Sequence, residues 1–253
     1  MIIQIYEIQT PHEAETLIEY GVDHIGSVLT PEVALNQPIL KETIDVVKSS
    51  ESKSSLIPLF SNADSILHAL DFYKPDIVHF CENLNKYVYQ SAAFNSLVDL
   101  QEKVKEKFPE ILIMRSIPIP RPGIAEFVSS IELVKTFGHV SDFFLTDTVI
   151  MNNQGQVPDA QPVKGFVGIT GLTCDWEIAR KLVDSTDIPV ILAGGLSPEN
   201  VFDGIKKVNP AGVDSCTQTN ACDMHGNPVR FIKDMARVKR FIEESGRAVI
   251  NNK

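Results

Sequence analysis

Short apolar runs rich in β-branched residues alternate along the chain with longer segments in which apolar residues recur every three or four positions. The first pattern is typical of buried strands and the second of amphipathic helices. The strands predicted in this way are Ile2–Ile8, His24–Leu29, Leu56–Phe60, Ile77–Phe80, Ile111–Ile117, Asp142–Leu145, Val190–Leu192 and Gly212–Ser215. The predicted helices are Pro11–Tyr20, Ile39–Lys48, Ala63–Phe72, Ser91–Lys107, Gly123–Phe137, Trp176–Val183, Pro198–Val208 and Val229–Glu244.

Strict alternation of strands and helices predicts a parallel sheet, because each helix returns the chain to the edge where the next strand begins. Eight such units allow the sheet to close into a (β/α)8 TIM barrel, which typically takes about 250 residues. The chain has 253 residues and no Gly/Ser-rich linker. We therefore expect residues 1–253 to form one α/β barrel domain.

One connection is much longer than the others. It runs from Thr148 to Cys174, between the sixth strand and the following helix. A long βα connection lies at the end of the barrel where such enzymes bind their substrates, and this length is typical of a lid or substrate loop. A plain surface insertion is the alternative.

Charge and composition exclude several classes of function. The net charge of -10 argues against a nucleic-acid partner, which requires clustered cations. The basic stretch Arg230–Arg240 is interspersed with apolar residues, as on the solvated face of an amphipathic helix. No apolar run is long enough to cross a membrane, and the N-terminus resembles no signal peptide, so we expect a cytoplasmic protein.

The four cysteines are too few and too scattered for a disulfide framework. Cys216, Cys222 and His225 could be drawn as metal ligands, but their spacing matches no standard zinc pattern. We expect no metal and no redox cofactor.

The segment from Pro189 to Asn220 is the most informative part of the chain. It combines two short strands, a Gly194-Gly195 turn before a helix and a second turn of small residues after the last strand. In (β/α)8 barrels, the loops after strands 7 and 8 often hold a phosphate through backbone N–H groups and a helix N-terminus. The sequence therefore predicts a phosphorylated small-molecule ligand.

Four blocks of sequence in this half of the chain resemble phosphoribosylanthranilate isomerase, a family of the tryptophan biosynthesis pathway. They are LTDT, GITGLTCDW, LAGGLSPENV and GVDSCTQTN, and PVRFIKDMARVKRFI is similar to the family's C-terminal segment. The strong resemblance covers roughly the last 110 residues, and EAETLIEYGVDHIGSVL carries a weaker one near the N-terminus. It implies a barrel of the ribulose-phosphate-binding type and an aldose–ketose (Amadori) isomerase.

Residue roles follow from the resemblance only at matching positions. Gly194 and Gly195 would bind the substrate phosphate, and Cys216 and Thr217 stand where the family completes that site with backbone donors. Asp147 matches the family's general acid, which protonates the ribose ring oxygen. The alternative is that Asp147 only ties the long loop.

The loop that follows is also family-like. Thr170, Gly171, Thr173 and Asp175 match its pattern, although Asp175 is more simply the N-cap of the next helix.

The first strand departs from the family pattern. The family's general base is a cysteine followed by glycine, and Tyr6 and Glu7 occupy these two positions here. A tyrosine with a pKa near 10 is a poor base, whereas a carboxylate is a competent one if the backbone turns it into the barrel mouth. Glu7 is thus a candidate base, and simple alternation would instead point it outward.

The aromatic end of the site is changed as well. The family's basic segment after strand 2, whose arginine contacts the anthranilate carboxylate, is replaced by Thr30–Gln37, which contains no cation. Arg115 at the end of strand 5 is a candidate replacement if it faces the pocket. His79 at the end of strand 4 is a candidate proton shuttle or a structural hydrogen-bonding residue.

Three functions remain consistent with the sequence. The first is an Amadori isomerase of the phosphoribosylanthranilate type. The second is a diverged barrel that acts on another sugar phosphate. The third is a non-catalytic protein that binds a phosphorylated ligand. A homodimer is compatible with all three, and fold alone does not choose among them.

Overall fold

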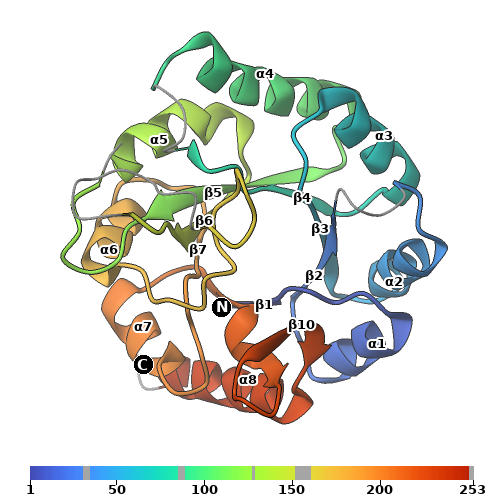
Figure 1. Cartoon of the computed structure of the whole chain (residues 1–253), viewed down its shortest axis with the longest axis vertical. Helices are drawn as coiled ribbons and strands as arrows, with labels where there is room; N and C mark the ends of the chain where they lie inside the picture. Colours follow the sequence, from blue (N-terminus) through green and yellow to red (C-terminus); the bar gives the residue numbers. More distant parts are fainter. Residues whose placement is uncertain (31–34, 85–88, 127–128, 152–160, 251–253) are drawn as a thin grey trace.

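Eight parallel strands close into a barrel, and helices surround it (Figure 1). The computed structural model describes residues 1–30, 35–84, 89–126, 129–151 and 161–250. The barrel strands are β1 (Ile2–Ile5), β2 (His24–Leu29), β3 (Lys53–Pro58), β4 (Ile77–Phe80), β5 (Leu112–Ile119), β6 (Phe143–Thr148), β7 (Val190–Leu192) and β8 (Gly212–Ser215). Pairing of Ile2–Ile5 with Gly212–Ser215 closes the ring. The predicted TIM barrel is confirmed.

The outer layer consists of α1 (Pro11–Glu19), α2 (Pro38–Lys48), α3 (Ala63–Tyr73), α4 (Ala92–Lys107), α5 (Ser130–Phe137), α6 (Trp176–Asp184), α7 (Val201–Val208) and α8 (Met235–Ile250). Short polar side chains start several of these helices. Thr10 caps α1, Asn62 caps α3 and Asp175 caps α6, each accepting a hydrogen bond from a first-turn amide. Such caps satisfy donors that the helix itself leaves unpaired.

Polar side chains fill the inside of the barrel in two layers. In the lower layer, Gln4 Nε2 donates to Asp214 Oδ1 at 3.1 Å, and the Gln4 Oε1 to His24 Nδ1 distance is 3.0 Å. In the upper layer, the Tyr6 hydroxyl lies 2.6 Å from Ser55 Oγ and 2.9 Å from His79 Nδ1. These bonds fix the floor above which a ligand can enter.

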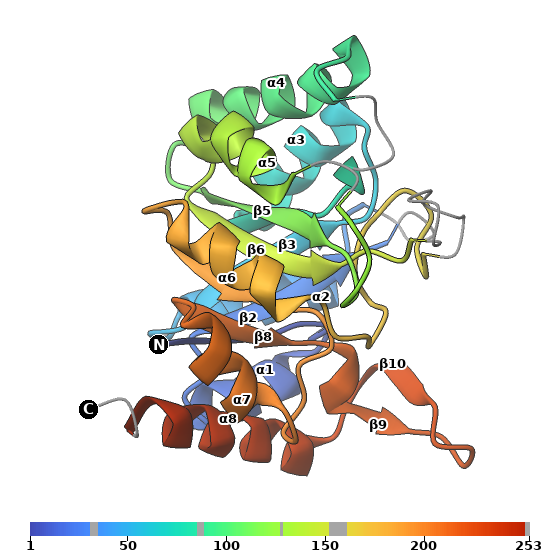
Figure 2. The ribbon, with the colours of Figure 1, turned by 90° about the vertical axis from the view of Figure 1, so that its left-hand side faces the viewer.

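A small hairpin at the carboxyl end of the barrel differs from the prediction. The sequence predicted a helix from Val229, but β9 (Asn220–Cys222) and β10 (Pro228–Lys233) pair antiparallel first. The turn forms because Asp223 Oδ1 accepts hydrogen bonds from the amides of His225 and Asn227, and Gly226 takes a positive φ of 81°. Figure 2 shows the hairpin beside the barrel.

Several other predicted boundaries differ from the structure by a few residues, and two of them differ most clearly. β1 ends at Ile5 rather than Ile8, because the backbone leaves the strand direction at Glu7, where φ is 67°. The fifth helix begins at Ser130, and residues 121–126 before it are not helical.

Arg115 lies outside the barrel wall, contrary to the expectation that it faces the pocket. Its side chain is fully buried, donates to Glu82 Oε2 at 2.5 Å and to Gln101 Oε1 at 2.6 Å, and packs against the rings of Phe80 and Phe137. The reason is strand alternation, because the neighbouring Met114 occupies the inward position and contacts Gln4.

Replacing Arg115 with alanine should destabilise the protein by about 3–5 kcal/mol, because Glu82 would keep a buried charge without its partner. The double variant Arg115→Met/Glu82→Leu removes both charges and should recover most of this loss. Urea unfolding measures the stability of the single and the double variant. A single variant as stable as the wild type would show that the ion pair is not needed.

Candidate active site

A cavity opens above the polar floor, at the carboxyl ends of the strands. Its lining comes from seven of the barrel strands or the loops that follow them, and it includes three carboxylates but no lysine or arginine among the described residues. The lining residues are Tyr6, Glu7, Val28, Ile57, Leu59, His79, Cys81, Leu145, Asp147, Val167, Ile169, Thr170, Gly171, Gly194, Gly195, Leu196, Asp214, Cys216, Thr217 and Gln218.

Asp147 stands at the end of β6, on the cavity wall. Removal from water raises its pKa to about 7, and the hydrogen bond from the Thr148 amide only partly offsets this. The carboxylate packs closely on Gly168, where an added Cβ would lie 2.1 Å from Asp147 Oδ2. A carboxyl group in this state holds a proton near neutral pH and is suited to act as a general acid.

Asp214 on β8 is a second carboxyl group of this kind, and it was missed in the sequence. Burial raises its pKa to about 7, and the charge of Asp147 contributes, although Gln4 donates to it. The signal was present, because Asp214 is an acid within the otherwise apolar strand GVDS. The cavity therefore has two acidic groups that titrate near neutral pH.

Glu7 also reaches the cavity, because its left-handed backbone departs from simple strand alternation. Burial alone would raise its pKa, but the Arg230 guanidinium, the Asn220 amide and the Lys233 ammonium together lower it below 4.5. Arg230 Nε donates to Glu7 Oε1 at 2.6 Å, and Asn220 Nδ2 donates to Oε2 at 2.9 Å. Glu7 is therefore ionised at neutral pH.

Tyr6 and His79 form the floor of the cavity. Burial raises the pKa of the Tyr6 phenol well above 10, so the group stays protonated. Burial also lowers the pKa of His79 to about 3, and both ring nitrogens have partners, the Tyr6 hydroxyl and Ser116 Oγ. This geometry favours the structural alternative for His79.

Apolar side chains form one wall of the cavity. Val28, Leu59, Cys81 and Val167 line the cavity and belong to one buried cluster, which also includes Val149 and Phe166. The described part of the predicted lid contributes to it, since Val167 N donates to Cys81 O. Residues 152–160 of that loop lie outside the described residues. The wall suits a flat apolar group.

The opposite side of the cavity consists of glycine-rich loops. Gly194, Gly195, Gly171, Cys216 and Thr217 all line it, as the sequence predicted for a phosphate site. The amides of Gly195 and Thr217 donate to no other described residue. Free amides that line a cavity next to the start of a helix suit an anion.

Gly195 cannot be replaced without crowding. Its φ is 62°, and an added Cβ would lie 2.4 Å from the carbonyl carbon of Leu172 in the β6–α6 connection. The glycine thus lets two loops that line the cavity approach each other.

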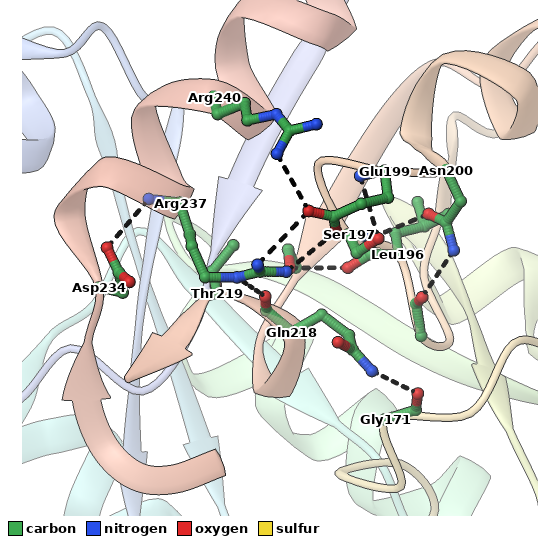
Figure 3. Close-up of polar contacts among 12 residues, drawn as sticks. Gly171, Leu196, Ser197, Glu199, Asn200, Gln218, Thr219, Asp234, Arg237 and Arg240 are labelled. Atoms are coloured by element: carbon green, nitrogen blue, oxygen red, sulfur yellow. Dashed lines mark hydrogen bonds and ion pairs between the residues drawn. The ribbon is translucent and has the colours of Figure 1, made fainter. Parts of the chain in front are cut away.

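An ion-pair network holds these loops in place (Figure 3). Arg237 on α8 donates to Glu199 Oε2 and to the carbonyl of Gln218, both at 2.9 Å, and Arg240 reinforces Glu199 at 3.3 Å. Gln218 in turn donates to Gly171 O at 2.8 Å. The network therefore joins α8 to the three loops around the glycine-rich side.

Comparisons with known proteins cover the part of the chain that contains this site. A family model described as N-(5'phosphoribosyl)anthranilate (PRA) isomerase matches residues 118–218, which include Asp147 and both loops. The chain is 28% identical over 250 residues to N-(5'-phosphoribosyl)anthranilate isomerase 1 of Methanosarcina mazei, covering 96% of this chain and 93% of that protein. The chain resembles this family over residues 118–218, and it is similar along most of its length to proteins named as phosphoribosylanthranilate isomerases.

Other proteins named as phosphoribosylanthranilate isomerases are similar as well. The Methanosarcina acetivorans isomerase is 25% identical over 247 residues, covering 96% of this chain and 92% of that protein. The solved structure of the Pyrococcus furiosus isomerase has a TM-score of 0.66 at 19% identity and covers 98% of this chain and 99% of that chain, which supports the fold.

The described residues include no group of three or more His, Cys, Asp or Glu arranged to hold a metal ion. No helix within them has the length and apolar character needed to span a membrane.

Replacing Gly195 with alanine should weaken the binding of inorganic phosphate by about tenfold or more, equivalent to at least about 1.4 kcal/mol, because the added methyl group pushes the two loops apart. Isothermal titration calorimetry measures the affinity. Gly226→Ala is the matched control, because Gly226 also has a positive φ but has nothing within 4 Å of an added Cβ. Equal phosphate affinity in both variants would contradict the assignment of this side of the cavity.

Proposed function

We propose that this protein catalyses the Amadori isomerisation of a phosphoribosyl amine of the N-(5'-phosphoribosyl)anthranilate type, within tryptophan biosynthesis. The supporting observation is the contrast between two carboxyl groups of one cavity. Asp147 has a pKa raised to about 7, and Glu7 has a pKa lowered below 4.5. Surroundings that move the pKa values of two titratable groups in opposite directions mark one group as the acid and the other as the base.

The two groups act in sequence. Protonated Asp147 gives its proton to the ribose ring oxygen, the C1–O bond breaks, and the nitrogen lone pair forms a C=N bond. Ionised Glu7 then removes the proton from C2, which gives an enol. Return of a proton to C1 and loss of the hydroxyl proton produce the ketone. The product is an isomer of the substrate, so the reaction balances without any co-reactant.

Each part of the substrate has a matching side of the cavity. The amides of Gly195 and Thr217 bind the phosphate, and the apolar wall around Val28 and Val167 binds the aromatic ring. Tyr6 occupies the position of the family's cysteine, and its protonated phenol makes it unsuitable as a base. Glu7, the next residue, takes over that role.

A second candidate is isomerisation of another phosphorylated sugar. It is favoured by the absence of lysine and arginine from the described lining, because an aromatic carboxylate requires a positive partner. A homodimer and a cytoplasmic location stay predictions; one Thermotoga maritima relative is described as dimeric.

Wild-type protein should convert N-(5'-phosphoribosyl)anthranilate generated in situ, followed by the loss of its fluorescence. Asp147→Asn and Glu7→Gln should each lower kcat by about 10²–10⁴-fold, because each removes one proton-transfer group. Since Asp147 acts protonated, kcat/KM should fall as the pH rises through about 7. Since Glu7 acts ionised, the acidic limb should lie below pH 4.5.

Asp71→Asn is the matched control, because Asp71 is exposed on α3 and does not line the cavity, and it should leave kcat unchanged. A folded wild type without turnover, whose melting temperature still rises with inorganic phosphate, would overturn the isomerase and leave a phosphate-binding barrel.

A further inference from the structure

The β9–β10 hairpin brings a cation into contact with Glu7, which lines the cavity. Arg230 on β10 contacts Glu7 on β1, more than two hundred residues away in the chain, through the 2.6 Å bond from Nε. The hairpin strands pair only with each other, so side-chain contacts of this kind attach them to the barrel. Arg230 therefore belongs to an element that is separate from the barrel sheet.

Arg230 has unused hydrogen-bonding capacity. Its Nη2 is buried and has no partner among the described residues. The guanidinium lies over the ring of Phe231, 4.6 Å from the centroid, and the side chain is 35% exposed. Phe231 packs against the apolar cluster that includes Val28 and Val167. The free N–H groups thus lie beside the wall that suits an aromatic ring.

The neighbouring lysine is not available for a ligand. Lys233 Nζ donates to Cys216 O at 2.8 Å and to Asn220 Oδ1 at 2.5 Å, and Thr219 Oγ1 lies 3.5 Å away. An ammonium group has three N–H donors, so these contacts use its capacity. Of the two cations that lower the pKa of Glu7, Arg230 alone keeps an unpaired donor within the described part of the chain.

We propose that Arg230 recognises the carboxylate of the substrate's aromatic half and exchanges its bond to Glu7 for this contact, which frees Glu7 to act as the base. The proposal rests on the isomerase function proposed above and adds the residue that selects the substrate. It makes Arg230 a specificity-determining residue contributed by the hairpin.

The charges around Arg230 explain why it would exchange its bond to Glu7 for one to the substrate carboxylate. The cavity lining has the ionised carboxylate of Glu7 and no cation among the described residues, so Glu7 would repel the carboxylate of a substrate without Arg230. A guanidinium binds a carboxylate through two parallel N–H bonds, and Nη2 and Nε provide such a pair. While Arg230 bonds to Glu7, it stabilises the carboxylate and weakens it as a base. Binding of the correct substrate therefore activates Glu7.

The test uses two stable ligands and binding rather than turnover. One is the reduced product analogue that carries the 2-carboxyphenylamino group, and the other is the same compound with an unsubstituted phenylamino group. Calorimetry should show that the wild type prefers the carboxylate ligand by about 10–100-fold. In Arg230→Gln the preference should fall below about threefold, with unchanged affinity for the phenylamino ligand.

Two more variants complete the experiment. Arg230→Lys keeps the charge but not the paired donors, so its preference should be intermediate. Arg247→Gln, an exposed arginine on α8 that pairs with Glu244, should behave as the wild type. A preference that survives Arg230→Gln, or equal weakening of both ligands, would overturn the proposal while leaving turnover by the wild type intact. A wild type that neither binds these ligands nor turns over the substrate would overturn the isomerase function as well.

Discussion

The left-handed backbone of Glu7 is the constraint on which the chemistry of this cavity depends. A strand that continued past Ile5 would turn position 7 outward, towards the surrounding helices. At φ 67° the Glu7 side chain instead lies on the cavity wall, held by Asn220 and Arg230. A non-glycine residue in this conformation costs roughly 1–2 kcal/mol, and strain of this kind is found at functional sites. The hydrogen bonds to the hairpin offset that cost.

Opposite electrostatic surroundings within one barrel give the carboxyl groups of Asp147 and Glu7 different pKa values. Asp147 lies on a wall without a described cation, so loss of water dominates and the group holds its proton. Glu7 lies beside the hairpin, where Arg230 and Lys233 outweigh the same loss of water. The barrel thus provides an acid and a base from residues of one chemical type. The hairpin makes the difference, since it contributes Arg230 and Lys233 as well as Asn220.

Much of this could be predicted from the sequence, and the failures have identifiable causes. The barrel followed from strict alternation of elements, the Gly194-Gly195 loop from its place between a strand and a helix, and the expected role of Asp147 from the family resemblance. Arg115 was misplaced because buried polar side chains occur on both faces of the barrel strands, so that polarity does not reveal which side points inward.

The hairpin was missed for a different reason. Apolar residues from Phe231 onward also fit helical spacing, and they concealed the Asp223–Asn227 turn. As a result Arg230 was assigned to a solvated helix face. Its contact with Glu7 links residues at opposite ends of the chain, and no local pattern reports such a contact.

The central claim is that Asp147 is protonated and Glu7 ionised in the same cavity near neutral pH. Carbon-13 NMR of protein labelled at the aspartate and glutamate carboxyl carbons tests it, with assignments from the signals lost in Asp147→Asn and Glu7→Gln. The account predicts that Asp147 titrates near pH 7 and Glu7 below 4.5. Titration of Asp147 near its ordinary value of 3.8, or of Glu7 near 7, would contradict it.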